Sequence, residues 1–264
     1  MNRKRFRKGI LFGIFTAVMI STVSGCGIAN HSTNGEYQEK SYTSEKAVNT
    51  VVVNSSRIDV VVSSSADDKF HVTCYENDRY KFNISELDDG TLQVKKQDVK
   101  KFTVFELPSD LQEITVQVPA SFDGELQIVS ERAKLSCSSI RAGNIEIESK
   151  RGKIELNKVN ATGSITINSY RDSISLVDIA VKDEISIVNG RETIYFQNIE
   201  FGSNLKIENH RGDITGYLKG AKTDYTLLCE VERGESNLPA NLPGGEKNIH
   251  IKNSRGDVNV EFDE

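Results

Sequence analysis

The sequence predicts an all-β fold, namely a parallel β-solenoid with coils of about 20 residues and a β-rich N-terminal cap region. Three observations support this prediction. Four consecutive segments repeat with a period of 20 residues and without gaps. Apolar and polar residues alternate within each repeat, as they do in a strand with one buried face. No apolar period of about 3.6 residues persists over three helical turns, so helices are not expected.

The clearest copies of the repeat are residues 143–162, 163–182, 183–202 and 203–222. The apolar residues of these copies form columns: Ile145, Ile165, Ile185 and Leu205; Ile147, Ile167, Ile187 and Ile207; and Ile154, Ile174, Ile194 and Ile214. Two further columns begin at Leu156 and Val159 and are broken at Gly216 and Lys219. The many β-branched residues favour strands over helices.

A single coil cannot bury its own apolar face, so the coils are expected to stack. Equivalent strands would then pair about 4.8 Å apart and turn each apolar column into a continuous ladder. Residues 124–142 and 247–262 are looser copies, and Tyr225–Asn237 resembles a half-coil. The repeats therefore occupy residues 121–264 and make about six or seven coils, with Leu238–Glu246 as a loop before the final coil.

The region before the repeats, residues 49–120, is β-rich but does not follow the period. Its runs Val51–Val53 and Ile58–Val62 fit a first coil. The remainder of this region is expected to form a hairpin excursion or a small sandwich. Either would cover the open end of the stack and block edge-to-edge pairing.

The N-terminus has the three parts of an export signal. Met1–Lys8 is basic, Ile10–Val23 is an apolar run of about 14 residues, and Val23-Ser24-Gly25-Cys26 resembles the bacterial lipobox. We expect residues 1–25 to be a lipoprotein signal peptide, and Cys26 to carry the lipid that holds the chain at the extracytoplasmic face of the cell membrane. An ordinary secretory signal or an uncleaved anchor is the alternative. Residues 26–48 are polar and aperiodic, and are expected to be a flexible tether.

A short motif recurs at the turns as Arg151-Gly152-Lys153-Ile154, Arg211-Gly212-Asp213-Ile214 and Arg255-Gly256-Asp257-Val258. Together with Ile114–Pro119 before the repeats, it resembles the bacterial putative-adhesin family of β-strand-repeat domains over roughly residues 50–262. That family has no known function. The resemblance implies a β-solenoid without enzyme activity. The copies at Asp172-Ser173 and Glu192-Thr193 depart from the glycine-containing pattern.

Composition and motifs exclude several function classes. The formal net charge of −5 becomes −10 without residues 1–25, because these hold 5 of the 33 basic residues and no acid, and this balance argues against a nucleic-acid partner. The four histidines lack metal-ligand spacing with another histidine or a cysteine, and no Gly-x-Ser-x-Gly or phosphate-binding glycine loop occurs. We therefore expect no enzyme activity, no cofactor and no metal. Cys74, Cys137 and Cys229 are interpreted as small buried apolar residues.

One charged column stands out: Arg151, Arg171, Arg191 and Arg211 recur every 20 residues, with Arg132, Arg233 and Arg255 at equivalent turns. Stacking would align these guanidinium groups into an anion-binding edge suited to phosphate, sulfate or carboxylate. The alternative is a solvated arginine row that is balanced by nearby acids, namely Glu131, Asp172, Glu192, Glu232 and Asp257. The two Arg-Gly-Asp tripeptides, at 211–213 and 255–257, lie at this turn, where the repeat consensus explains them without an adhesion receptor.

These observations favour a non-enzymatic surface lipoprotein that binds an anionic envelope polymer, a glycan or another envelope protein along its solenoid. A regulatory or scaffolding partner in envelope stress is the alternative. A carbohydrate-active enzyme is a remote third hypothesis, since the outward columns contain no clustered pair of acids.

Overall fold

The computed structural model describes residues 37–78, 80–98 and 113–263. The predicted signal, the lipid-attachment residue Cys26 and most of the predicted tether lie outside the described residues. Within them, strands dominate, with one short 3₁₀ helix at Lys222–Asp224. No helix of the described residues is long and apolar enough to cross a membrane.

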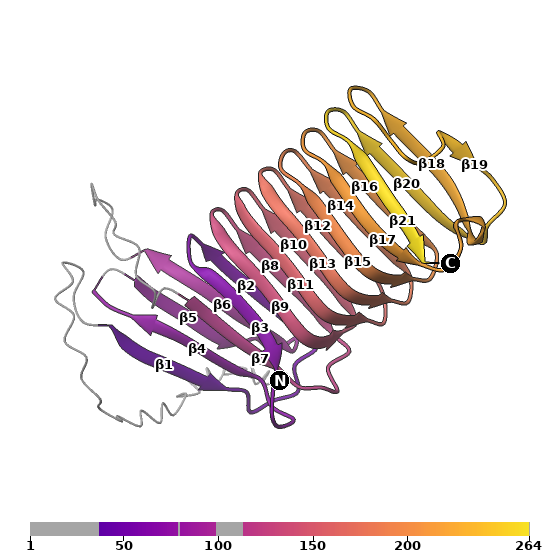
Figure 1. Cartoon of the computed structure of the whole chain (residues 1–264). Coiled ribbons are helices and arrows are strands. Elements are labelled where there is room, and N and C mark those ends of the chain that lie inside the picture. Colours follow the sequence, from indigo (N-terminus) through magenta and orange to yellow (C-terminus); the bar gives the residue numbers. More distant parts are fainter. Residues whose placement is uncertain (1–36, 79, 99–112, 264) are drawn as a thin grey trace, which may run out of the picture. The chain divides into compact units, whose positions relative to one another are not determined.

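The strands form two sheets, which Figure 1 shows as the two faces of a stack of coils. The ten-stranded sheet contains, in spatial order, β1 (Gln38–Thr43), β4 (His71–Glu76), β7 (Glu113–Val118), β3 (Asp59–Ser64), β9 (Ala133–Ala142), β11 (Gly152–Ala161), β13 (Asp172–Val181), β15 (Ile194–Phe201), β17 (Ile214–Lys219) and β21 (Val258–Asp263). The eleven-stranded sheet contains β19 (Asn241–Leu242), β18 (Tyr225–Val231), β20 (Lys247–Asn253), β16 (Asn204–Asn209), β14 (Glu184–Asn189), β12 (Ile165–Ser169), β10 (Asn144–Ser149), β8 (Glu125–Ser130), β2 (Thr50–Ser56), β6 (Thr91–Asp98) and β5 (Tyr80–Glu86).

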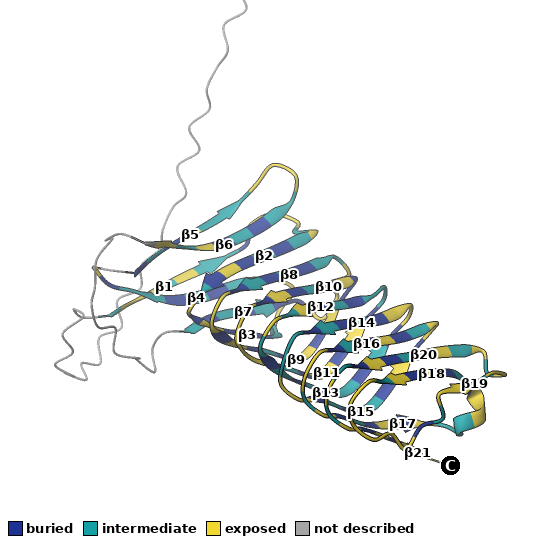
Figure 2. Cartoon of the chain, turned by 90° about the horizontal axis from the view of Figure 1, so that it is seen from above, coloured by how far each residue is buried: buried dark blue, intermediate teal, exposed yellow. Residues whose placement is uncertain are grey.

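The predicted β-solenoid is confirmed, and so is its register. Ile145 pairs in parallel with Ile165, and Ile165 pairs with Ile185, so residues one period apart are direct neighbours. The isoleucines of the predicted columns are at most 2% exposed. Figure 2 shows buried and more exposed residues alternating along the strands, as expected when one face of each strand packs inside the stack.

The longer strands of the ten-stranded sheet bend once in each coil. The bend falls at Ser139, Lys158, Asp178 and Asn198, which all have φ of 54–56°. This left-handed conformation breaks the alternation, so that Asn157 and Lys158 both face outwards while Leu156 and Val159 are buried. After the bend a further buried column forms from Ala142, Ala161, Val181 and Phe201, which the sequence analysis did not include.

The chain doubles back at both ends of the stack. β2 and β3 lie next to β8 and β9, and the later strands β6 and β7 lie outside them. The described strands of this region therefore continue both sheets, β2 with β3 makes the expected early coil, and β5 with β6 forms an antiparallel hairpin at the end of one sheet. At the other end β21 is the last strand of the ten-stranded sheet, as expected, but β20 inserts between β16 and β18 in the other sheet. The loop at Leu238–Glu246 gives the chain the length to return.

The predicted tether also needs correction, because Gln38–Thr43 forms β1 and pairs antiparallel with β4. Tyr42 packs against the core, and the Lys40 ammonium donates to the Phe82 carbonyl at 2.6 Å and to Glu76 at 2.9 Å. An edge strand of this kind needs few apolar residues, since one side of it faces solvent. This is why the polar sequence resembled a linker.

The break in the fourth apolar column has a packing reason. Among the described residues Phe196 is the largest fully buried side chain, and a Cβ on the neighbouring Gly216 would lie only 2.0 Å from the Phe196 ring. Gly216 thus leaves the space that the phenyl ring fills. At the fifth column β17 lacks the bend residue, and Leu218 pairs with Ile199 in place of Lys219.

We predict that Gly216→Ala lowers the free energy of unfolding by about 1–3 kcal/mol, because the added methyl group overpacks the core against Phe196. Phe196→Leu in the same chain should recover part of this loss, since leucine already occupies this column in two other coils. A double-mutant cycle measured by denaturant unfolding checks the coupling. Additive effects of the two substitutions would contradict the assigned contact.

Candidate functional site

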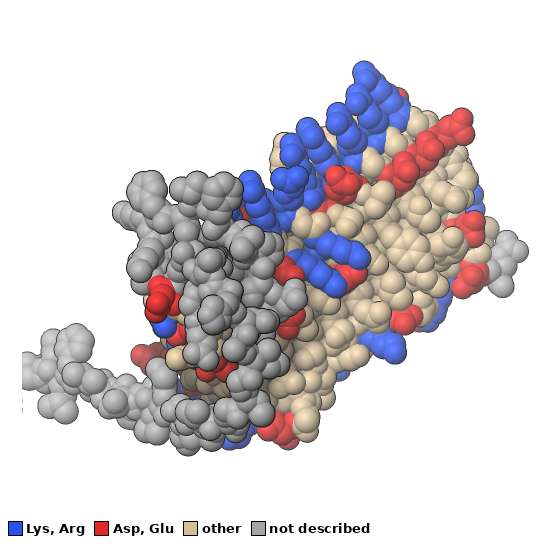
Figure 3. All heavy atoms as spheres, turned by 60° about the vertical axis from the view of Figure 1, so that its left-hand side comes forward, with Lys and Arg blue, Asp and Glu red and all other residues tan. Residues whose placement is uncertain are grey.

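The turns that follow the strands of the eleven-stranded sheet lie along one edge of the stack. Arg151, Arg171, Arg191 and Arg211 occupy these turns in four consecutive coils, just after β10, β12, β14 and β16. Figure 3 shows a row of basic side chains along this edge. Because each coil repeats the register of its neighbour, the predicted arginine column exists as a spatial row. We call this row the arginine edge.

The acids that the sequence analysis considered as balancing charges do not pair with this edge. Glu131 accepts from the Lys150 ammonium at 2.9 Å. Asp172 points inwards and is fully buried. Across the parts of the chain that the structure describes, no ion pair joins any of the four arginines to an acid. Glu192, by contrast, lines a hollow with Arg151, Arg171 and Arg191, so the balanced-row alternative stays a prediction beside the anion-binding one.

The two Arg-Gly-Asp tripeptides are part of the stacking. The backbone N–H of Asp257 donates to the Asp213 carboxylate at 2.9 Å, and that of Glu235 donates to the Asp257 carboxylate at 2.9 Å. Gly212 and Gly256 have φ of 120° and 124°, which glycine adopts without strain. Each aspartate thus accepts a hydrogen bond from the neighbouring coil, and not from its own turn as expected. The repeat accounts for both tripeptides.

A ladder of polar side chains lies just inside the arginine edge. The Asn209 amide donates to the carbonyls of Glu192 and Gly212, and the Asn253 amide donates to those of Gly212 and Gly256. These bonds satisfy turn carbonyls of two adjacent coils at once. The sequence carried this signal as a column of Ser149, Ser169, Asn189 and Asn209 with the 20-residue period, which the search for chemical motifs missed.

Three hollows line the edge around its middle coils. The first, of about 440 Å³, is lined by Ser169, Tyr170, Val188, Gly190, Arg191, His210 and Arg211. The second, of about 300 Å³, also includes Tyr170 and Val188 and extends past Ser149 and Lys150. The third, of about 330 Å³, lies among Arg151, Arg171 and Arg191, beside Gly152, Ser173 and Glu192. The arginine edge therefore combines cationic groups with concave surface.

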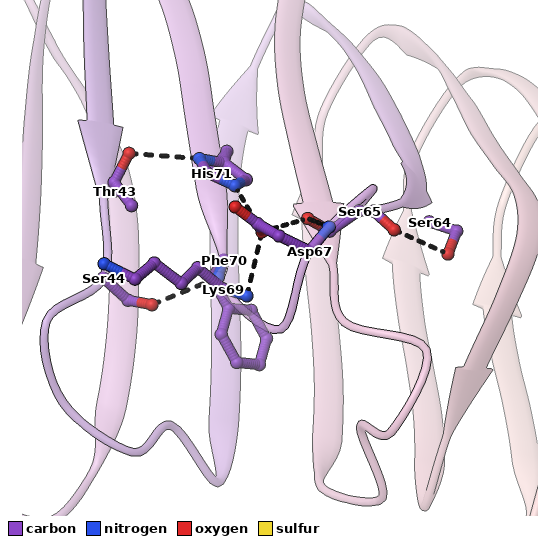
Figure 4. Close-up of polar contacts among 8 residues, drawn as sticks. All are labelled: Thr43, Ser44, Ser64, Ser65, Asp67, Lys69, Phe70 and His71. Carbon is purple, nitrogen blue, oxygen red and sulfur yellow. Dashed lines mark hydrogen bonds and ion pairs between the residues drawn. The ribbon is translucent and has the colours of Figure 1, made fainter.

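A second polar cluster, at β1 and β4, links a hydroxyl, an imidazole and a carboxylate in the same order as a hydrolytic triad (Figure 4). His71 Nδ1 lies 3.0 Å from Thr43 Oγ1, and His71 Nε2 lies 2.8 Å from Asp67 Oδ1. Bonds from His71, the Ser65 hydroxyl and the Lys69 backbone lower the pKa of Asp67 to about 2. This carboxylate is exposed, unlike the buried orienting acid of a hydrolytic triad. Since Thr43 and His71 are direct partners on β1 and β4, the cluster fastens the end strand.

The remaining sequence predictions concern cysteines and metals. Cys74, Cys137 and Cys229 are buried and free, as expected for small apolar residues. Burial raises the pKa of Cys137 to about 12, so this thiol is not a nucleophile. No group of three or more His, Cys, Asp or Glu side chains in the described residues is arranged to hold a metal ion.

Asp172 is the one buried acid at the edge. Its Oδ1 accepts from the Ser149 hydroxyl at 2.9 Å, whereas its buried Oδ2 has no hydrogen-bond partner among the described residues. Burial raises the pKa of Asp172 above the ordinary value of 3.8, and the bond from Ser149 opposes this shift. The folded chain therefore binds a proton here more tightly than the unfolded chain does. Its stability falls as the pH rises from the ordinary pKa of the unfolded aspartate through the raised pKa of the folded one.

We predict that Asp172→Asn raises the free energy of unfolding by about 1–3 kcal/mol at pH 7, because a neutral amide replaces a charge that lacks full hydrogen bonding. The gain should shrink as the pH falls through the raised pKa of Asp172, because the aspartate then takes up its proton. Thermal and denaturant unfolding between pH 4 and pH 7 measure this difference. The exposed Asp183→Asn is the matched control, and a loss of stability in the Asp172 variant at pH 7 would refute the assignment.

The chain was compared with known proteins, solved structures and protein families. No curated protein matches the chain. A crystal structure from Clostridium sporogenes described as a putative cell adhesion protein is 12% identical, over 86% of this chain and 100% of that chain, with a TM-score of 0.37. Structures from Parabacteroides distasonis, described as a putative lipid binding protein, and Parabacteroides merdae, described as a putative adhesin, are each 17% identical over 88% of this chain and 98% of theirs, with TM-scores of 0.29 and 0.28. The family model described as Toastrack DUF4097 matches residues 48–264, and the chain belongs to this family of β-strand-repeat domains.

Proposed function

We propose that this chain is a non-enzymatic, lipid-anchored surface module that binds an anionic polymer of the cell envelope or of a host surface along its arginine edge. The observation that supports this function is the row of four arginines in adjacent coils, none of which pairs with an acid of the described residues. The polymer completes a charge arrangement that the fold leaves open.

The electrostatics of the row favour a polyanion. Two unit charges about 5 Å apart repel by about 0.8 kcal/mol in water, and stacking places the arginine turns at about this spacing. The stack therefore holds like charges together without a direct ion pair to an acid of the described residues. A linear ligand with repeated anionic groups relieves several of these repulsions at once, and the guanidinium forks match carboxylate, sulfate or phosphate oxygens.

The N-terminal sequence supports a position of the module at the membrane surface. The lipobox-like Val23-Ser24-Gly25-Cys26 would place a lipid on Cys26, 11 residues before Tyr37, where the described structure begins. Such an anchor with two or three acyl chains holds a protein stably at a membrane. The solenoid is then kept beside the polymers of the envelope. Many weak contacts along an edge suit this placement, because binding to a repeating ligand is multivalent.

We predict that replacing Arg151, Arg171, Arg191 and Arg211 together by Gln weakens binding of polygalacturonate or polyphosphate about 100-fold at low salt. This estimate follows because each exposed charge contact contributes up to about 1 kcal/mol. Isothermal titration of the full chain in detergent measures the effect. The wild-type affinity should fall as salt is added, since salt screens exposed charges.

The matched control replaces Lys134, Arg141, Lys206 and Lys219 by Gln, which changes the net charge equally at cations that are paired with acids. This control should retain binding. Equal weakening by both variants would reduce the effect to overall charge, and a wild-type chain that binds neither polymer would refute the proposal. Crosslinking on intact membranes that recovers a protein partner irrespective of the arginines would instead support the scaffolding alternative.

A further inference from the structure

We infer that the arginine edge contains a sugar-ring subsite at Tyr170, so that its ligand is an acidic polysaccharide. This inference rests on the proposed function and names the ligand class. Tyr170 holds a turn position that is occupied by Lys150, Gly190 and His210 in neighbouring coils. At 55%, its exposed fraction is the largest among the exposed large hydrophobic residues that the structure describes.

The surroundings of Tyr170 form a concave platform. Its ring lines both the hollow of about 440 Å³ and the hollow of about 300 Å³, and Val188 contributes apolar surface to both. Gly190 makes this possible, because a Cβ there would lie 2.9 Å from Tyr170 Cδ2 and 2.6 Å from its carbonyl oxygen. The ring therefore stands between two cavities, with Arg191 and Arg211 beside the larger one.

One cationic group lies over the Tyr170 ring, and two more line the larger hollow beside it. The Arg171 guanidinium lies 5.3 Å from the centroid of the Tyr170 ring, which is within cation–π range. Arg171 Nε is buried and has no hydrogen-bond partner among the described residues. The platform thus joins an exposed aromatic face to anion-binding groups within a few ångströms, in the arrangement that binding sites share: apolar surface with a few placed polar groups.

The two turns beside the platform depart from the repeat at a cost in stability. Glu192 has φ of 84° at the turn position that glycine holds in other coils. Asp172, at the same position one coil earlier, is a fully buried acid with an unpaired oxygen. In a repeat protein any coil can use the consensus glycine turn. Both departures lie in the coils that carry Arg171 and Arg191, next to the platform.

The chemistry of the platform selects a sugar. The C–H face of a pyranose ring is apolar, and its slightly positive hydrogens suit the negative face of an aromatic ring. A polyphosphate chain offers no such face. A polysaccharide that carries carboxylate or sulfate groups provides both features, with a ring on Tyr170 and anions on Arg171, Arg191 and Arg211.

The test compares Tyr170→Ala with Tyr170→Phe and with Tyr217→Ala, a control at an exposed tyrosine on β17 of the other sheet. Binding of oligogalacturonate and of inorganic polyphosphate to the full chain in detergent is measured by titration. We expect Tyr170→Ala to weaken oligogalacturonate binding about tenfold, which corresponds to about 1.4 kcal/mol. Tyr170→Phe and Tyr217→Ala should retain it. Polyphosphate binding should change by less than about twofold in all three variants.

Two other outcomes separate this inference from the function on which it rests. If Tyr170→Ala leaves oligogalacturonate binding intact, or weakens polyphosphate equally, the sugar-ring subsite is overturned while the arginine edge stands. If the wild-type chain binds neither ligand, the proposed function fails and the subsite fails with it. Circular dichroism of each variant confirms that the fold is retained.

Discussion

The structure depends on in-register parallel pairing of equivalent strands from successive coils. This pairing places every residue beside the residue one period away, and thereby turns each isoleucine column into a continuous buried ladder. Burying a side chain of this size contributes about 1.5–3 kcal/mol, and no single coil can obtain that contribution alone. The register that joins the isoleucines also fixes the position of everything else in the coil, including the asparagine ladder and the arginine edge.

The in-register pairing also places identical polar residues of successive coils side by side, whether or not they attract one another. Asparagines benefit, since each amide bonds carbonyls of two coils. The arginines of the adjoining turn are aligned by the same register, and none of the four forms an ion pair with an acid of the described residues. Two acids of these turns have other partners, since Glu131 binds Lys150 and Asp213 accepts a backbone N–H, whereas Glu192 lies in the hollow among the arginines. The charge of the arginine edge therefore lies on the turns, outside the buried ladders. Binding of an anionic ligand there needs no change in the fold.

The sequence was sufficient for the features that repeat and insufficient for those that occur once. The period predicted the coils, their register and the alignment of the arginines, and the break at Gly216 had its cause in Phe196. Insertion of β20 between β16 and β18 was not predictable, because both β18 and β20 match the repeat and only tertiary packing decides their order. β1 was missed because an edge strand carries little apolar signal. The Asp67–His71–Thr43 cluster and the Tyr170 platform join residues whose proximity depends on loops and turns.

The proposed binding function requires that the fold itself does not neutralise the arginine edge. The most direct measurement is the free energy of unfolding of the full chain and of Arg191→Gln in detergent, at low and at high ionic strength. An uncompensated row predicts that the variant is at least as stable as the wild type at low salt, and that any gain disappears once salt screens the neighbouring guanidinium groups. A variant that is clearly less stable at low salt would show that Arg191 is bound within the protein, and would contradict the account.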